Sequence, residues 1–336
     1  MRQTPLAATL LLRHDVARPL PPMTEGAGLS TIPEPLAGTA PAVFEKLEER
    51  FEGIRGDNQL ERLWSGGRWL EGPVYSPAGR YLLFSDIPND RILRWDETSY
   101  GVSVFRQPAG YTNGHTLDEQ GRLVSCEHGN RRVTRTNHNG SIQVLADNWD
   151  GKRLNSPNDV VVHPDGSIWF TDPAYGIDSD YEGFEGEIET DGCHVYRIDP
   201  ASGAITRVAD DFDRPNGLAF SLDGTQLYIT DTERAHIRRF DVKDNGLTGG
   251  ELFAECGNGA FDGIRLDNRG RIWGAAADGA HVYHPDGTLL GKLLVPETVS
   301  NLTFGGPKRN RLFLTATTSV YSLLLTTTGA PQPYDA

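Results

Sequence analysis

Six copies of one short pattern recur along the chain, and this internal repeat limits the fold more than any other feature of the sequence. Each copy opens with a residue that carries a side-chain oxygen, and successive copies start 39 to 58 residues apart. The six openings are Glu71-Gly-Pro-Val-Tyr, Asn113-Gly-His-Thr-Leu, Asn158-Asp-Val-Val-Val, Asn216-Gly-Leu-Ala-Phe, Asp262-Gly-Ile-Arg-Leu and Asn301-Leu-Thr-Phe-Gly. A period of this length is typical of one blade of a β-propeller.

Each copy also carries the turn and strand signals of a four-stranded sheet. In five copies a glycine stands eight residues after the opening residue and predicts a tight turn into a second apolar strand. These glycines are Gly79, Gly121, Gly166, Gly224 and Gly270. Four strands per copy predict an all-β, six-bladed β-propeller. The sixth copy has only three strand patterns, so we expect the upstream segment 60–64 to complete its blade and remove an open edge.

The repeat divides the chain into an N-terminal extension at 1–59, a propeller at 60–325 and a C-terminal tail at 326–336. The extension is rich in Pro, Gly and Ala up to about residue 40, so we expect it to be partly disordered. Apolar residues at four-residue spacing predict a short helix near 41–51.

The first 25 residues bear on the cellular location. An apolar run at 6–12 follows Arg2 and could form the core of a secretory signal, but charged residues follow it directly and no clean small-x-small cleavage site is present. We therefore expect a cytoplasmic protein. A periplasmic or secreted location is the alternative if residues 1–25 act as a signal.

Charge and cysteine content exclude several classes of partner. The chain has 46 acidic and 32 basic residues and a formal net charge of −14. Nucleic acid and anionic membrane surfaces require clustered Lys and Arg, so neither is expected as a partner. Three cysteines without a C-x-x-C pair are too few for a disulfide scaffold, and no apolar run approaches the roughly 20 residues that span a membrane. We therefore expect a small-molecule ligand as the partner, and a monomer or homodimer as the oligomeric state.

The six opening residues are expected to meet on the propeller axis, because the first strand of each blade lines the central channel. Asn-Gly and Asp-Gly are also common turn dipeptides, so each residue taken alone could simply start its strand. Glu71 argues against this interpretation for the whole set, because Glu is a poor turn former. A ring of carboxylate and amide oxygens suits one divalent cation, Ca²⁺ first, with Mg²⁺, Mn²⁺ or Zn²⁺ as alternatives. No organic cofactor is predicted.

The same segments resemble the SMP-30/gluconolactonase/LRE family, in particular its bacterial gluconolactonase branch. The resemblance covers roughly residues 60–325 and rests on the order and spacing of several motifs. These are Glu71-Gly-Pro-Val-Tyr, Asn113-Gly-His-Thr-Leu, Cys126-Glu-His-Gly-Asn-Arg-Arg132, Ser156-Pro-Asn-Asp-Val-Val, Phe170-Thr-Asp-Pro-Ala-Tyr-Gly176, Arg214-Pro-Asn-Gly-Leu and Phe261-Asp-Gly-Ile. The resemblance implies a six-bladed, calcium-dependent lactonase.

The resemblance also implies roles for individual residues. Glu71, Asn158, Asn216 and Asp262 match the metal ligands of the family, and Asp262 matches a residue with a proton-transfer role. Ser156 departs from the animal members, in which an arginine that contacts the sugar stands at this position. The sugar contacts of that branch therefore do not transfer to this chain.

Five residues are predicted to contact the substrate, namely Asn113, His115, His128, Tyr175 and Asn301. Asn113 and Asn301 belong to the predicted ring, whereas His128 and Tyr175 follow second strands and return to the same face. His115 occupies a mostly apolar strand position, so it is either a packed core residue or a channel group near the metal.

An acidic loop at 177–192 is the longest interruption of the repeat. Its seven acidic residues are typical of a solvated surface loop. A lid over the pocket mouth or a second Ca²⁺ site is the alternative, and the aromatic residues Tyr181 and Phe184 favour the lid.

Together these features predict metal-dependent hydrolysis of a sugar lactone in carbohydrate metabolism, with D-glucono-1,5-lactone and its product D-gluconate as the first choice. The cation would activate the carbonyl as a Lewis acid, and Asp262 would act as the acid/base. The alternatives are another aldonolactone, a phosphotriester-like substrate, or a Ca²⁺-stabilised binding propeller without turnover. The sequence contains neither a Gly-x-Ser-x-Gly elbow nor a dinucleotide- or phosphate-binding loop.

Overall fold

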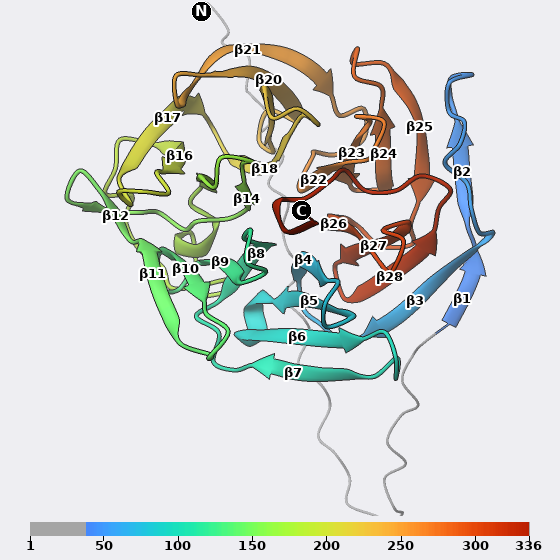
Figure 1. Cartoon of the computed structure of the whole chain (residues 1–336), viewed down its shortest axis with the longest axis horizontal. Coiled ribbons are helices and arrows are strands. Elements are labelled where there is room, and N and C mark those ends of the chain that lie inside the picture. The colour runs from blue at the N-terminus through green and yellow to red at the C-terminus, as the bar shows by residue number, and fades with distance from the viewer. Residues whose placement is uncertain (1–37, 336) are drawn as a thin grey trace, which may run out of the picture. The chain divides into compact units, whose positions relative to one another are not determined.

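A computed structural model describes residues 38–335, in which six antiparallel β-sheets follow one another around a common axis (Figure 1). The predicted all-β, six-bladed β-propeller is therefore confirmed. The candidate signal at 1–25 lies outside the described residues. Within the described part of the chain, no helix is long and apolar enough to cross a membrane.

Blades 1 to 3 each contain four strands. Blade 1 consists of β4 (Leu70–Ser76), β5 (Tyr81–Asp86), β6 (Arg91–Asp96) and β7 (Val102–Arg106). Blade 2 consists of β8 (Thr112–Leu117), β9 (Leu123–Glu127), β10 (Arg132–Thr136) and β11 (Ile142–Ala146). Blade 3 consists of β14 (Val160–Val162), β15 (Ile168–Asp172), β16 (Cys193–Ile198) and β17 (Ile205–Phe212). A short hairpin of β12 (Asn148–Trp149) and β13 (Lys152–Arg153) lies between blades 2 and 3 in the chain.

Blade 4 also contains four strands, whereas blades 5 and 6 each add strands from the N-terminal part of the chain. Blade 4 consists of β18 (Pro215–Phe220), β19 (Gln226–Asp231), β20 (His236–Lys243) and β21 (Gly246–Glu255). Blade 5 consists of β22 (Ile264–Leu266), β23 (Ile272–Ala276), β24 (Gly279–Tyr283), β25 (Leu289–Leu294) and β2 (Val43–Lys46). Blade 6 consists of β26 (Val299–Gly305), β27 (Arg311–Ala316), β28 (Ser319–Leu324), β3 (Gln59–Ser65) and β1 (Gly38–Pro41). The 3₁₀ turns are η1 (Ile87–Asn89), η2 (Tyr175–Ile177) and η3 (Pro333–Asp335).

The N-terminal strand β3 closes the ring by pairing antiparallel with β28, which confirms the closing strand predicted at 60–64. The predicted helix near 41–51 is wrong, because β1 pairs with β3 and β2 pairs with β25. Phe44 and Phe51 pack against the core between blades 5 and 6, whereas Val43 and Leu47 of the presumed helix face are about half exposed. A lone helix of this length is marginal in water, while pairing satisfies the exposed edges of two blades.

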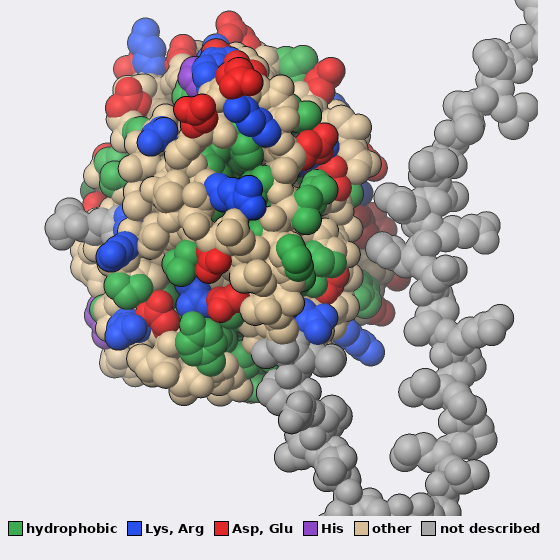
Figure 2. Space-filling model, turned by 90° about the vertical axis from the view of Figure 1, so that its right-hand side faces the viewer, with side chains coloured by type: hydrophobic (Ala, Val, Ile, Leu, Met, Phe, Trp, Pro, Cys, Tyr) green, Lys and Arg blue, Asp and Glu red, His purple; other side chains and the backbone are tan. Residues whose placement is uncertain are grey.

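Six large apolar clusters fill the spaces between neighbouring blades in the described chain. Trp95 is buried between blades 6 and 1, Trp169 between blades 3 and 4, and Trp273 between blades 5 and 6. Each blade thus packs an apolar face against each of its two neighbours. Both faces of its sheet are therefore covered and must be apolar. On the molecular face seen in Figure 2, acidic and basic side chains are interspersed, so this face offers no extended basic surface to nucleic acid.

The turn glycines of the repeat behave as predicted in four copies. Gly121, Gly166, Gly224 and Gly270 have φ between 72° and 82°. In blade 1 the left-handed conformation falls instead on Arg80 (φ 51°), and in blade 6 it falls on Arg309 (φ 54°). Blades 1 and 6 therefore keep the left-handed turn, although an arginine rather than a glycine adopts it there.

Acidic residues at the ends of second strands hold the segments that lead into the first strands. Asp86 Oδ1 accepts a hydrogen bond from the backbone N–H of Arg68 (3.0 Å), and Asp172 Oδ2 accepts one from Asn155 (2.8 Å). Asp231 does the same in blade 4 through the N–H groups of residues 213 and 214. Each of these carboxyl groups thus holds the segment just before the first strand of its own blade.

Asp172 is buried and forms no ion pair with any residue that the structure describes. Asp86, by contrast, forms an ion pair with Arg91 (2.7 Å). Asp172 Oδ1 likewise has no hydrogen-bond partner between residues 38 and 335, and burial raises the pKa of this carboxyl to about 7, although the backbone N–H groups of Asn155 and Ser156 oppose the shift.

We expect the stability of the wild type relative to the variant Asp172→Asn to fall as the pH rises from about 4 to about 8. The folded pKa lies above the unfolded value, so the neutral carboxyl contributes fully below pH 4 and this contribution is lost as the pH rises through about 7. For a shift of this size the loss is at most about 4 kcal/mol. Denaturant unfolding of both proteins across this range measures the effect, and a difference that does not change with pH contradicts it.

Candidate functional site

The six residues that open the repeat lie next to one another around the axis, and we call them the axial ring. They are Glu71, Asn113, Asn158, Asn216, Asp262 and Asn301. Neighbouring openings are in contact, since Gly114 N, directly after Asn113, donates to Asn158 O (2.8 Å), and Asn301 Nδ2 donates to Glu71 Oε2 (3.0 Å). Asp262 is partly exposed, whereas the other five are at most 4% exposed. The structure therefore brings the six openings together, as the repeat predicts.

Glycine follows four of the ring residues because the backbone of the next blade passes within contact distance. A Cβ atom on Gly72 would lie 1.9 Å from Asn113 O. Gly114, Gly217 and Gly263 face similarly close neighbours. The pairing of first and second strands also shifts directly after the ring residue, as between Glu71 and Val74, and such a bulge re-orients the side chain there. Local sequence and blade contact together direct the ring side chains to the axis.

Buried hydroxyl groups of the second strands bind the backbone of the ring. Thr171 Oγ1 of blade 3 donates to Asn216 O of blade 4 (2.8 Å), and Thr230 Oγ1 of blade 4 donates to Asp262 O of blade 5 (2.9 Å). Donor and acceptor belong to neighbouring blades in both cases. The spacing of the blades and the position of the ring residues are therefore fixed by the same bonds.

Two carboxyl groups of the ring, those of Glu71 and Asp262, influence each other strongly. Burial and then the charge of Asp159 raise the pKa of Glu71 to about 7, although hydrogen bonds from Gly72 N and Asn301 oppose this shift. Burial and then the charge of Glu71 raise the pKa of Asp262 well above its usual value. A positive charge placed between the two groups would reverse both shifts by favouring the ionised forms.

The remaining donors of the ring fit a hard divalent cation. Among the described residues, Asn113 Oδ1 and Asn216 Oδ1 have no hydrogen-bond partner and are buried. Asn113 Nδ2 donates to His128 Nε2 (3.2 Å), and Asn216 Nδ2 donates to Thr232 Oγ1 (3.0 Å). Carboxylate and amide oxygens are the ligands that Ca²⁺, Mg²⁺ and Mn²⁺ prefer. Across residues 38–335, no group of three or more His, Cys, Asp and Glu side chains is arranged to hold a metal, so a cation here would need the amide oxygens.

Two of the predicted substrate residues outside the ring lie beside it. His128 is buried next to Asn113, and burial lowers its pKa to about 4, so its imidazole is neutral. Tyr175 stacks on the guanidinium of Arg214 (5.3 Å to the ring centroid). Burial raises the pKa of Tyr175, and the charge of Asp262 adds to this rise, so the phenol lies near that carboxyl.

His115 is not brought to the ring. Its Nε2 is 2.8 Å from Ser85 Oγ and its Nδ1 is 2.8 Å from Ser125 Oγ. Burial lowers the pKa of His115 to about 3. Both nitrogens of a neutral, buried ring are therefore engaged, and of the two interpretations offered by the sequence the packed core residue is the one that these bonds support.

An ion pair near the ring was missed by sequence reasoning. Arg265 Nη1 and Nη2 bind Asp159 Oδ2 and Oδ1 at 2.9 and 3.2 Å, and the pair joins blade 5 to blade 3 across the channel. The two charges act in opposite senses on the pKa of Glu71, Asp159 raising it and Arg265 lowering it. The available signal was a charged residue within an apolar first strand, two positions after Gly263.

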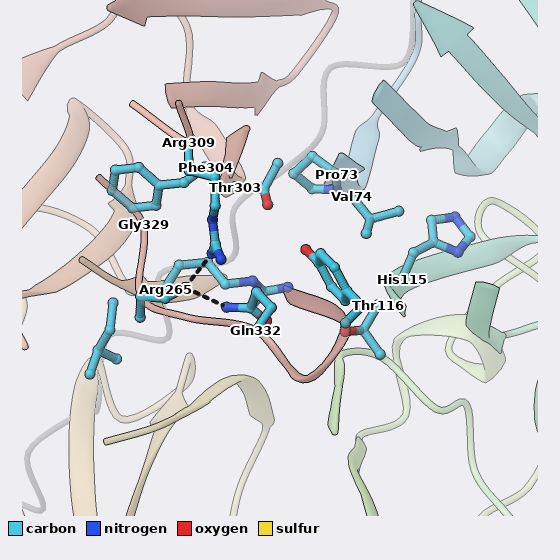
Figure 3. A pocket seen from close by; sticks show the side chains of 13 residues that line it. Pro73, Val74, His115, Thr116, Arg265, Thr303, Phe304, Arg309, Gly329 and Gln332 are labelled. Carbon is cyan, nitrogen blue, oxygen red and sulfur yellow. Dashed lines mark hydrogen bonds between the residues drawn. The ribbon is translucent and has the colours of Figure 1, made fainter. Parts of the chain in front are cut away.

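A small cavity lies further along the first strands and is closed by the C-terminal segment (Figure 3). Its walls include Pro73, His115, Thr116, Arg265 and Thr303 from the strands. Gln332 and Tyr334 line it from the C-terminal side, and Arg309 Nη2 and Gln332 Nε2 both donate to Ala330 O. The described part of the segment predicted as a C-terminal tail at 326–336 thus packs against the axis.

Comparison with known proteins extends the similarity over most of the chain. Residues 69–318 match a family model described as the SMP-30/Gluconolactonase/LRE-like region. A gluconolactonase of Zymomonas mobilis subsp. mobilis is 31% identical over 320 residues, which cover 87% of this chain and 88% of that protein. A pentonolactonase of Haloferax volcanii is 30% identical over 258 residues, covering 73% and 80%. Among solved structures, a gluconolactonase from Xanthomonas campestris is 37% identical with a TM-score of 0.81, covering 90% of this chain and 98% of that chain.

Proposed function

Since the chain belongs to the SMP-30/Gluconolactonase/LRE-like family and is a lactone hydrolase, we propose that it hydrolyses D-glucono-1,5-lactone to D-gluconate with the help of one divalent cation. Glu71, Asn158, Asn216 and Asp262 would hold this cation, and Ca²⁺ is the first candidate. The observation that carries the proposal is the pair of buried carboxyl groups beside unpaired amide oxygens. Such groups are costly to bury unless a cation or ligand binds them.

Hydrolysis adds one water molecule across the acyl C–O bond of the lactone. The water oxygen bonds to the carbonyl carbon, the bond to the ring oxygen breaks, and the ring oxygen leaves as a hydroxyl group. When bound, a divalent cation stabilises the negative charge that develops on the carbonyl oxygen. The protein must supply the group that moves the proton from the water to the leaving oxygen.

Asp262 is the candidate for this proton transfer. The residue as a whole is partly exposed although its carboxyl group is buried, whereas Glu71 is 2% exposed, so Asp262 lies nearer to solvent than Glu71. Coordination to a cation lowers the basicity of a carboxylate, so one oxygen of Asp262 would have to stay free to take the proton.

The other predicted substrate residues divide into contacts and supports. Asn113 Oδ1 and the Tyr175 phenol are polar groups beside the ring that a hydroxylated ligand could bind. His128 has both nitrogens engaged, with Asn113 Nδ2 and with Glu182 O. We therefore assign His128 the role of orienting Asn113, and Asn301 that of orienting Glu71, to which it donates a hydrogen bond.

Another aldonolactone is the second candidate substrate. The Haloferax volcanii relative is named a pentonolactonase, and under this proposal the cation and Asp262 act on the lactone group, which the two substrates share, rather than on the end of the sugar. A cytoplasmic role in carbohydrate metabolism, as monomer or homodimer, accompanies both candidates.

We expect Asp262→Asn to lower kcat for D-glucono-1,5-lactone by about 10²- to 10⁴-fold, the usual contribution of a general acid/base. Asparagine keeps an oxygen donor and the side-chain shape but cannot take the proton. Acid release followed by pH-stat titration measures the rate. The matched control is Asp150→Asn, an exposed turn residue with φ 52° at which Asn is well tolerated. A rate for Asp262→Asn near that of the wild type would show that Asp262 does not transfer the proton.

Chelation is expected to slow hydrolysis and to lower the thermal unfolding midpoint, and Ca²⁺ is expected to restore both. Ligands from four blades bind the cation only in the closed ring, so saturation at 100 times Kd stabilises the fold by about 3 kcal/mol. Asn216→Ala removes one donor and should raise the Ca²⁺ concentration for the half-maximal midpoint shift at least about tenfold. Asn148→Ala, which is exposed on a hairpin, is the control. A wild-type midpoint that responds to neither chelator nor Ca²⁺ argues against the cation.

A further inference from the structure

The acidic loop at 177–192 reaches from blade 3 over two other blades. The Phe184 ring lies edge-on against Tyr111 of the segment before blade 2, with centroids 5.2 Å apart. Tyr181 extends further, since the charges of Arg68 and Asp86 at blade 1 act on its phenol. Of the two interpretations left open by the sequence, a solvated loop or a lid, these contacts support the lid.

Hydrogen bonds and ion pairs hold the lid in this position. Phe184 N donates to Gly176 O (3.1 Å), which folds the loop back on its own beginning. Asp178 pairs with Arg214 at 2.9 Å, and Arg131 Nη2 donates to Glu187 O at 3.2 Å. An acidic side chain at the start of the loop and a backbone carbonyl near its end therefore fasten it to the propeller.

Glu182 differs from these fastening residues. In the described chain its carboxyl group has no hydrogen-bond partner, and the residue is partly buried. Its backbone carbonyl accepts a hydrogen bond from His128 Nδ1 (3.2 Å), whose Nε2 accepts one from Asn113 of the ring (3.2 Å). The lid is thus tied to the axial ring at this residue.

Glu182 lies on the ring side of the lid, since its backbone carbonyl is joined through His128 to Asn113 of the ring. Burial and then the charge of Glu71 raise the pKa of Glu182 to about 8, and the charge of Glu182 adds to the effects of burial and Glu71 that raise the pKa of Asp262. A cation bound at the ring would favour the ionised form of these carboxyl groups. A lactone bound at the ring would lie next to Glu182 under the function proposed above. An unpartnered carboxylate at this position has two oxygens that can each accept a hydrogen bond.

We propose that Glu182 binds hydroxyl groups of the lactone ring and so selects polyhydroxylated lactones; the inference rests on the proposed lactonase function. A partly buried carboxylate that binds substrate hydroxyls is left unpaired when the substrate lacks them, and this penalty is what gives a site selectivity. Asp262 remains the group that moves the proton, and Glu182 binds the part of the ligand that does not react.

The test compares two six-membered lactones, D-glucono-1,5-lactone and δ-valerolactone, which has the same ring without hydroxyl groups. The variants are Glu182→Gln, which keeps the shape and removes the charge, and Glu185→Gln, an exposed residue of the same loop, as the matched control. We expect Glu182→Gln to raise KM for gluconolactone about tenfold or more, the usual loss of a charge-assisted hydrogen bond. Its kcat, the kinetics with δ-valerolactone and all values for Glu185→Gln should stay within about twofold.

Three results would overturn the inference. Equal losses on both lactones would mean that Glu182 acts in the reaction or in folding, and no change on either would mean that it does not contact the substrate. Loss of the Ca²⁺-dependent rise in unfolding midpoint in Glu182→Gln would make it a metal ligand. If the wild type hydrolyses neither lactone, the proposed function itself fails, whereas an active wild type whose preference between the two lactones is unchanged in Glu182→Gln defeats only the role of Glu182.

Discussion

The close approach of neighbouring blades at the axis is the contact on which the rest of the structure depends. Gly114 N lies 2.8 Å from Asn158 O, and a side chain on Gly72 would collide with Asn113 O. These contacts join the backbones of neighbouring sheets. The positions of the ring residues are therefore as well defined as the sheets themselves, unlike those of residues on a surface loop. A site that is built on rigid strands in this way is organised before a ligand arrives.

The same arrangement concentrates polar groups where burying them is unfavourable. Burial raises the pKa of both Glu71 and Asp262, and the charge of Glu71 raises that of Asp262 further. Within the described residues, two amide oxygens of the ring have no hydrogen-bond partner. The pair of Asp159 and Arg265 adds two further charges in the channel. A fold that keeps such groups on its axis gives up stability there, which is common at functional sites. A bound divalent cation would recover much of that loss and would link ring closure to activity.

The sequence was most informative where a feature recurred in all six blades. The repeat predicted the fold, the closing strand and the convergence of the ring, because a residue at one phase of six equivalent strands must meet its counterparts on the axis. Where a feature occurs once, its partners come from elsewhere in the fold. The strand β2 was predicted as a helix because its neighbour β25 lies about 250 residues away in the chain. His115 is bonded to Ser85 and Ser125 from two different blades, which no local pattern indicates. Glu182 is one of seven similar acids in its loop, and only the folded lid separates it from the others.

A crystal structure of the protein grown with saturating Ca²⁺ would show whether the axial ring is a metal site. We expect one calcium ion on the axis, with oxygens of Glu71, Asn158, Asn216 and Asp262 at about 2.3–2.6 Å. A calcium ion held by other residues, or a ring that stays free of calcium at saturating concentration, would contradict this expectation.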